Sequence, residues 1–404
     1  MFFRKTPKVS TDSEKIRSLL ERGVEDVFIK ESLEAKLKSG QQLRIKLGID
    51  PTGKTIHIGR AVVLRKLRQF QDLGHHIVLI VGDFTALIGD PSDKLEKRPM
   101  LTEAKIKENL ANYKKILGKI VDVDNVEFVY NSTWLSKLTF KEIAQLAEAF
   151  SVQQMSARRN FKDRIDRGEE ISMREFLYPL MQGYDSVAVN SDVEIGGFDQ
   201  LFNLKAGRIV QKHYGKKEQD VITFQMLEGT DGRKMSTSWG NVINITDEAH
   251  DMYGKIMSVR DDLLVKYFLL CTDVSEPEIE TIKQQLAQGT NPKEIKMRLA
   301  REIVTLYHSA KAAQQAEDNF TNTFSKGGVP ENIEMISASK DSLLADVLVE
   351  KGIVASKTEW RRLVTENAVT ETASNIKITD PFAKVESAGT YKIGKRRFIK
   401  IEVK

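Results

Sequence analysis

Cysteine is almost absent from this chain, because Cys271 is the single one among 404 residues. One thiol excludes an internal disulfide framework and is typical of proteins from a reducing compartment. The residues before it, Tyr267 to Leu270, are all apolar, so we expect a buried thiol that serves packing.

Long apolar runs are also missing. The longest, such as Ile77 to Val81, fall far short of the roughly 20 residues that span a bilayer. The basic start, Met1 to Ser10, is not followed by an apolar stretch, so we expect no signal peptide. These absences predict a soluble, cytoplasmic protein with no membrane partner.

Neither charge sign dominates, since 62 basic and 57 acidic residues leave a formal net charge of +5. This surplus allows a polyanionic partner without requiring one. Hydrophobic residues make up 41% of the chain, which excludes a wholly disordered protein. The length predicts about two to four domains.

Short apolar strands and amphipathic helices alternate from Leu43 onward. Such alternation predicts an α/β fold, a Rossmann-like parallel sheet with helices on both faces and ligands beyond the carboxyl ends of its strands. We predict strands at 43–49, 76–82, 126–130, 186–189 and 221–227, and helices at 58–73, 102–117, 140–150 and 200–213.

The strand pattern is confined to the middle of the chain, which predicts a series of domains. We expect an N-terminal helical segment (1–40) before the Rossmann-like sheet domain (41–245), into which helices are inserted at about 118–174. An all-helical domain (246–326) and a Gly- and Pro-containing linker (327–340) follow. The last part (341–404) has two short helices and strand-like alternation, which predicts a small α+β domain.

A phosphate-binding P-loop is one interpretation of Gly48 to Thr55, which matches G-x-x-x-x-G-K-[ST] between a strand and a helix. The strand that ends at Asp83 would then supply the carboxylate for magnesium. A P-loop NTPase therefore stays open as an alternative.

The next residues favour another family. Asp50-Pro51-Thr52 followed by His57-Ile58-Gly59 resembles the signature of class I aminoacyl-tRNA synthetases, in which a histidine and a helix N-terminus hold the phosphates of ATP. Far downstream, Asp231 to Ser238 resembles the mobile Lys-Met-Ser-Lys-Ser loop of the same class, which closes over ATP. A P-loop enzyme has no use for that second element.

Three further stretches resemble tyrosyl-tRNA synthetases of bacterial type. They are Gly82 to Ser92, Tyr178 to Asp185, and Ile195 to Gln200. Tyr178, Gln182 and Asp185 are spaced by four and three residues, which places them on one face of a helix.

The resemblance implies roles for these residues. Tyr178, Gln182 and the loop residue Asp90 would hold the α-ammonium group of tyrosine, Asp185 would accept a hydrogen bond from its phenol, and Gln200 would lie along the pocket. The tyrosine site as a whole would consist of Lys46, Gly48, Asp50, Asp90, Tyr178, Gln182, Asp185 and Gln200. No bound metal site of the protein itself is expected, because Mg2+ would arrive with ATP.

The implied reaction is attack of the tyrosine carboxylate on the α-phosphate of Mg·ATP, followed by transfer of the tyrosyl group to tRNA(Tyr). No protein nucleophile is needed, so catalysis would rest on orientation and charge stabilisation. ATP would contact Thr52, His57, Gly59, Lys234, Met235 and Ser236. The catalytic groups would be Thr52, His57, Arg60, Lys94, Arg98 and Lys234.

Three positions depart from the family pattern. Arg60 replaces the usual second histidine, Thr237 replaces the second lysine of the closing loop, and Lys46 stands where some members have a tyrosine for the substrate hydroxyl. We hypothesise that the cation gained at Arg60 compensates for the one lost at Thr237.

The C-terminal segment resembles the small S-four-like RNA-binding fold that ends many bacterial tyrosyl enzymes. Ser356 to Glu359 has capping-box form, with Lys357, Arg361 and Arg362 on the outward face of the helix that follows. Lys395, Arg396 and Arg397 add cations on a predicted hairpin. A local basic patch suits shape-based RNA contact, although a solvated basic face is the alternative.

Other functions remain open at this point. A non-catalytic RNA-binding relative is consistent with Arg60 and Thr237, and a tryptophanyl enzyme would share the class motifs. The family resemblance also implies a homodimer formed through the helices inserted at about 118–174.

Overall fold

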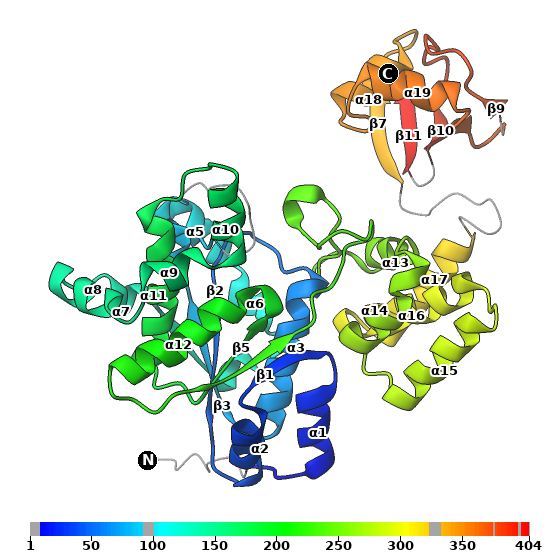
Figure 1. The fold of residues 1–404 in the computed structure, drawn as a ribbon. Coiled ribbons are helices and arrows are strands. Elements are labelled where there is room, and N and C mark those ends of the chain that lie inside the picture. Colours follow the sequence, from blue (N-terminus) through cyan, green and yellow to red (C-terminus); the bar gives the residue numbers. More distant parts are fainter. Residues whose placement is uncertain (1–8, 92–100, 323–332, 375, 395–396, 404) are drawn as a thin grey trace, which may run out of the picture. The chain divides into compact units, whose positions relative to one another are not determined.

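The computed structural model describes residues 9–91, 101–322, 333–374, 376–394 and 397–403 (Figure 1). It separates the chain into two compact units, Met1–Ala310 and Lys311–Lys404.

The first unit is built around a sheet with the order β1-β6-β5-β2-β3-β4. β1 is antiparallel to β6, and every other neighbouring pair in this sheet is parallel. The central strands are buried because helices cover them, and β3 has only its first residue, His76, partly exposed. The strands are β1 (Val24–Phe28), β2 (Arg44–Ile49), β3 (His76–Val81), β4 (Val126–Tyr130), β5 (Val193–Gly197) and β6 (Asp220–Phe224).

The predicted alternation of strands with helices is confirmed. The helices that belong to the sheet region are α1 (Ser13–Glu21), α2 (Lys30–Lys38), α3 (Ile58–Asp72), α4 (Thr85–Ile88), α5 (Glu103–Leu110), α6 (Tyr113–Leu117), α7 (Ser132–Leu135), α8 (Phe140–Ala147), α9 (Val152–Ser156), α10 (Arg159–Asp166), α11 (Met173–Ala188) and α12 (Leu201–His213).

Helices α11 and α12 lie side by side along the sheet, and Gly183 allows their close approach (Figure 1). A Cβ atom at Gly183 would lie 2.7 Å from Cγ2 of Val210 and 3.1 Å from the carbonyl oxygen of Ala206. Ser172 begins α11 with a capping box that includes Glu175, so the helix start is fixed by its own sequence. This packing holds the site-bearing face of α11 rigidly.

The remainder of the first unit is helical, as predicted after about residue 246. It consists of α13 (Ala249–Met257), α14 (Leu264–Cys271), α15 (Glu276–Ala287) and α16 (Pro292–Tyr307), with α17 (Ala310–Phe320) at the boundary between the units. Cys271 is 1% exposed, which confirms the expected buried thiol.

After α17, the second unit carries a sheet with the order β7-β11-β10-β8-β9 together with helices α18 and α19. Trp360 anchors its core at 1% exposure, and its indole N–H donates to the carbonyl oxygen of Pro381. The elements are β7 (Glu334–Ala338), α18 (Leu344–Glu350), α19 (Lys357–Thr365), β8 (Val369–Glu371), β9 (Ile376–Lys377), β10 (Gly389–Ile393) and β11 (Arg397–Val403).

Two predictions are wrong: the all-helical segment at 1–40 and the strand at 186–189. The first segment contains β1 as well as helices, because its Val-Glu-Asp-Val-Phe sequence forms an edge strand in which carboxylates are tolerated. Residues 186–188 end α11, and Asn190, with a φ of 47°, turns the chain into β5. The buried Glu194 and the two glycines of β5 conceal that strand in the sequence.

Two smaller corrections concern the helix at 102–117 and the linker at 327–340. The helix is divided into α5 and α6 at residues 111–112. The described part of the linker forms β7, which pairs in parallel with β11 from Glu334 to Ala338, so its polar sequence is that of an edge strand.

Candidate active site

Asp50 lies directly after β2, at the carboxyl end of the sheet, and two hydroxyl groups fix its carboxylate. The Tyr178 hydroxyl donates to Oδ2 at 2.8 Å, and Thr85 Oγ1 donates to Oδ1 at 2.8 Å. Gly82, at the end of β3, leaves the necessary room, since a Cβ atom there would lie 2.0 Å from Asp50 Oδ1. Burial and the nearby carboxylates raise the pKa of Tyr178, so its hydroxyl stays a donor.

Asp90 follows α4 and is 8% exposed. Gln200 Nε2 donates to its Oδ2 at 2.8 Å, and Asn203 Nδ2 donates to its Oδ1 at 3.4 Å. Arg158, from the inserted helical region, donates to Asn203 Oδ1 at 3.1 Å and stacks on the Phe202 ring. The predicted site residues Asp90 and Gln200 are therefore brought together, on a support that includes Asn203 and Arg158.

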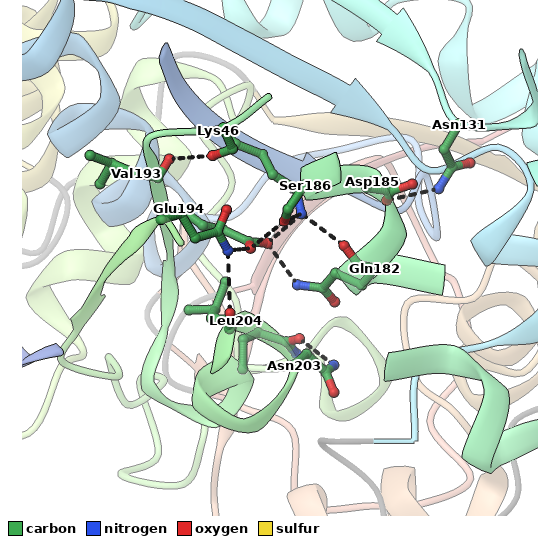
Figure 2. Close-up of polar contacts among 12 residues, drawn as sticks. Lys46, Asn131, Gln182, Asp185, Ser186, Val193, Glu194, Asn203 and Leu204 are labelled. Atoms are coloured by element: carbon green, nitrogen blue, oxygen red, sulfur yellow. Dashed lines mark hydrogen bonds and ion pairs between the residues drawn. The ribbon is translucent and has the colours of Figure 1, made fainter. Parts of the chain in front are cut away.

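Asp185 is on α11, with 3% exposure, and two donors come to it from the segment after β4. Trp134 Nε1 donates to Oδ1 at 2.8 Å, and Asn131 Nδ2 donates to Oδ2 at 3.3 Å (Figure 2 shows the Asn131 contact). Burial raises the pKa of Asp185 to about 7, against the lowering effects of Lys46, Trp134 and Asn131. The carboxyl group therefore changes its charge in the physiological range.

Lys46, on β2, forms a buried ion pair with Glu194 on β5, whose side chains have 0% and 0% exposure (Figure 2). Its Nζ lies 2.8 Å from Glu194 Oε1 and donates to Ser186 Oγ at 2.7 Å and to the backbone oxygen of Gln182 at 2.9 Å. An ammonium group has three N–H donors, and these contacts use all three. The prediction that Lys46 contacts the substrate directly is therefore not supported.

His57 caps the N-terminus of α3, as its position in the motif predicts. Its Nδ1 accepts from the backbone N–H of Arg60 at 3.3 Å. Burial, together with the charges of Arg60 and Lys234, lowers the pKa of His57 to about 3, so the imidazole is neutral. With Nδ1 as the acceptor, the proton is on Nε2, which makes that atom a hydrogen-bond donor for an anion.

The two halves of the nucleotide signature meet at this helix start. The backbone N–H of Ile58 donates to the carbonyl oxygen of Ile243 at 2.8 Å, which pairs the first motif with the segment after the second. A Cβ atom at Gly59 would lie 3.1 Å from His57 Nδ1 and 3.4 Å from Met235 Sδ. Only a glycine leaves space between these two motifs.

Cations surround the same helix start. Arg60 donates to Thr52 Oγ1 at 3.2 Å, and Lys234 forms an ion pair with Asp199 at 3.0 Å. In the same loop, the backbone N–H of Ser236 donates to Asn241 Oδ1 at 2.9 Å. The side chain of Asn241 thus holds the loop at Ser236, and Asp199 holds the side chain of Lys234.

Some predicted residues are not part of this arrangement. Lys54 is exposed and forms an ion pair with Glu108 on α5, which does not support a P-loop lysine over a phosphate. Gly48 is exposed, with open space where a Cβ would stand. Lys94 and Arg98 lie outside the described residues.

The described residues among those predicted to bind RNA lie on α19 and at the start of β11. Lys357 pairs with Asp346 at 2.5 Å, Arg361 stands over the Phe382 ring at 6.0 Å, and Arg397 pairs with Glu359 at 2.7 Å. Arg362 is exposed. Lys395 and Arg396 lie outside the described residues.

Several residues around the site carry no signal in their spacing. Most of them are remote in the chain from the motifs they support, so only the folded sheet brings them there, whereas Asn203 and Asn241 lie close in the chain to Gln200 and Ser236. These are Thr85, Asn131, Trp134, Arg158, Glu194, Asp199, Asn203 and Asn241.

Within the part of the chain that the structure describes, no helix is long and apolar enough to cross a membrane.

Comparison with known proteins identifies the family of the chain. The family model for class I tRNA synthetases (W and Y) matches residues 38–325. The tyrosine–tRNA ligase of Desulfotalea psychrophila is 45% identical over 95% of this chain and 96% of its own length, and that of Thermotoga maritima is 43% identical over 97% and 98%.

Solved structures show the same fold. A C-terminally truncated mitochondrial tyrosyl-tRNA synthetase from Aspergillus nidulans superposes with a TM-score of 0.62 at 23% identity, over 77% of this chain and 94% of that one. At that identity the likeness concerns the fold alone, whereas the family follows from the two bacterial relatives and the family model. The chain therefore belongs to the class I tRNA synthetases, in the tyrosine–tRNA ligase family.

Proposed function

We propose that the chain is a tyrosine–tRNA ligase, which activates L-tyrosine with Mg·ATP and then transfers the tyrosyl group to the 3' end of tRNA(Tyr). The observation that carries the proposal is the single face of α11 from which Tyr178, Gln182 and Asp185 reach the carboxyl end of the sheet. Full-length relatives with the name tyrosine–tRNA ligase support it.

The polar groups on this face of α11 support a binding site for tyrosine. Asp185 is the partner for the phenol hydroxyl, because it is a buried carboxyl group held by two donors. Tyr178, Gln182 and Asp90 supply the oxygen atoms that an α-ammonium group needs. Asp50 and Gln200 hold Tyr178 and Asp90 in place.

The phosphate side is supported by the start of α3. The neutral His57 offers its Nε2–H, while Thr52, Arg60 and Lys234 add a hydroxyl and two cations around the helix N-terminus. Anions are favoured there by the positive end of the helix dipole. Mg2+ enters this site with ATP as part of the substrate.

Catalysis in this proposal consists of positioning and charge stabilisation. The tyrosine carboxylate forms a bond to the α-phosphorus, the bond to the bridging oxygen breaks, and pyrophosphate leaves with the electron pair. Lys234 exchanges Asp199 for the developing phosphate charge as its loop closes. Lys94 and Arg98, which follow Asp90 in the sequence, are proposed to add cations for the pyrophosphate.

The other partners follow from surface chemistry. We expect tRNA to contact Lys357, Arg361, Arg362 and Arg397, and the sequence adds Lys395 and Arg396 as further candidates. A homodimer through the inserted helices is supported by large apolar side chains that face solvent in one chain. Phe140 is 88% exposed, and Val152 and Met173 are each 73% exposed.

Tyrosine-dependent ATP–pyrophosphate exchange is the experiment that tests this function. We expect exchange with L-tyrosine and none above background with tryptophan or phenylalanine. Exchange with tryptophan would identify a tryptophanyl enzyme, and ATP hydrolysis without an amino acid would favour a P-loop NTPase. Binding of tRNA without any exchange would leave a non-catalytic RNA-binding relative.

A further inference from the structure

The side-chain amide of Gln182 has a fixed orientation. Its Nε2 donates to Glu194 Oε1 at 3.1 Å, and an ionised carboxylate can only accept hydrogen bonds (Figure 2). The amide must therefore turn its NH2 group toward Glu194 and its oxygen the other way. Among the described residues, none donates a hydrogen bond to that oxygen.

Glu194 itself has no freedom to turn. Ser186 Oγ donates to its Oε2 at 3.2 Å, and Gln219 Nε2 donates to the same atom. Lys46 holds the other oxygen, Oε1, and shares it with Gln182. Four donors thus occupy a carboxylate with 0% side-chain exposure, and they fix the plane in which Gln182 is bound.

We propose that Glu194, held by Lys46, is a positioning residue that makes Gln182 present its amide oxygen to the α-ammonium group of tyrosine. The inference rests on the proposed function, because it takes Gln182 as an ammonium ligand. The opposite amide orientation would direct an NH2 group at the ammonium and repel it. Because Lys46 neutralises Glu194, the pair sets this orientation without adding net charge beneath the substrate.

A purely structural role for the ion pair is the alternative, since it also ties α11 to β2 and β5. The two roles are separated by a pair of ligands, L-tyrosine and 3-(4-hydroxyphenyl)propionate, which lacks only the amino group. A general loosening of the site raises the Kd values of both ligands by the same factor. Loss of the oriented amide oxygen of Gln182 raises the Kd for tyrosine alone.

The test variant is K46M/E194M, which replaces both charged groups by flexible apolar side chains and leaves no lone buried charge. We expect the Kd for tyrosine, measured by calorimetry on the full chain, to rise about tenfold, because hydrogen bonds to charged groups are the stronger ones. The Kd for the desamino ligand should change by less than about twofold. Q182M should show the same selective loss, and combining it with K46M/E194M should add nothing further.

A matched control exists on the same helix. Arg164 and Glu175 form another buried ion pair, with side chains 3% and 4% exposed, and Glu175 lies in the first turn of α11. R164M/E175M should lower stability while it leaves the ratio of the two Kd values unchanged.

The outcomes are distinct. A wild-type chain that binds no tyrosine refutes the proposed function. A wild-type chain that binds tyrosine, with a K46M/E194M variant that weakens both ligands equally, refutes the positioning role alone. If that variant does not fold, S186A removes the hydroxyl between Lys46 and Glu194, and the ratio should then shift about threefold in the same direction. An unchanged ratio in folded S186A would overturn the proposal.

Discussion

Replacing Asp185 by asparagine is expected to stabilise the chain at alkaline pH while it removes the partner of the tyrosine phenol. Burial raises the pKa of this carboxyl group from the usual 3.8 to about 7. One pKa unit corresponds to about 1.4 kcal/mol, so the ionised carboxylate destabilises the folded state by about 4 kcal/mol.

The sign follows from proton binding. The folded chain holds the Asp185 proton more tightly than the unfolded chain, so the free energy of unfolding falls as the pH rises from about 4 to about 7. Between pH 5 and pH 8 this loss amounts to about 3 kcal/mol. Asparagine does not ionise, so D185N should lack this part of the pH dependence. The amide also leaves one of the donors, Trp134 or Asn131, without its acceptor, a pH-independent loss of about 1 kcal/mol.

Urea unfolding at pH 5 and pH 8 measures this difference. The fluorescence of Trp134 should be followed, because its indole donates directly to Asp185 and reports on this unit of the chain. The exposed Asp124 provides a matched control, since D124N removes a carboxylate of ordinary surroundings. If the free energy of unfolding of D185N falls as much between pH 5 and pH 8 as that of the wild type, the pKa of Asp185 is not raised by burial and the reasoning is refuted.

Four further variants test the nucleotide site and the basic residues of α19. K54A should retain ATP–pyrophosphate exchange within about threefold, because Lys54 only makes a surface ion pair; a loss of several hundredfold would restore the P-loop interpretation. R60H should lower exchange about tenfold and T237K should recover it in that background, if the cation of Arg60 replaces the missing one; an unchanged R60H would exclude compensation. R361S/R362S should weaken tRNA binding and leave ATP–pyrophosphate exchange unaffected. The slope of the logarithm of the binding constant against the logarithm of the salt concentration should become shallower by about one for each phosphate contact that is lost. Filter binding at several salt concentrations measures this slope.

The site was predictable where the chemistry lies within one stretch of chain. His57 to Gly59 opens a helix and Tyr178 to Asp185 lies on one helical face, so spacing alone places these side chains. The partners of Asp185 could not be found in this way, because Asn131 follows β4 and meets α11 only through the order of the strands. Sequence spacing contains no information about which strands are neighbours.

Lys46 and Glu194 show a second limit of sequence reasoning. A lysine and a glutamate inside strands suggest exposed positions, because burial of a charge is unfavourable unless a partner of opposite charge compensates it. Here each is the partner of the other, across two neighbouring strands that are 148 positions apart in the chain, at 46 and 194. The sequence therefore suggested Lys46 as a substrate ligand, since its partner Glu194 was unknown.

The antiparallel edge strand has a consequence for synthesis on the ribosome. Among the described strands β1 pairs only with β6, and Val24 meets Phe224, so the first strand made must wait for the last strand of its sheet. At about 5–20 residues per second this delay is on the order of tens of seconds. Glu25 and Asp26 then act as gatekeepers, because their charges disfavour aggregation of an unpaired strand during that interval. The same carboxylates that hide β1 in the sequence thus protect the nascent chain until the sheet can close.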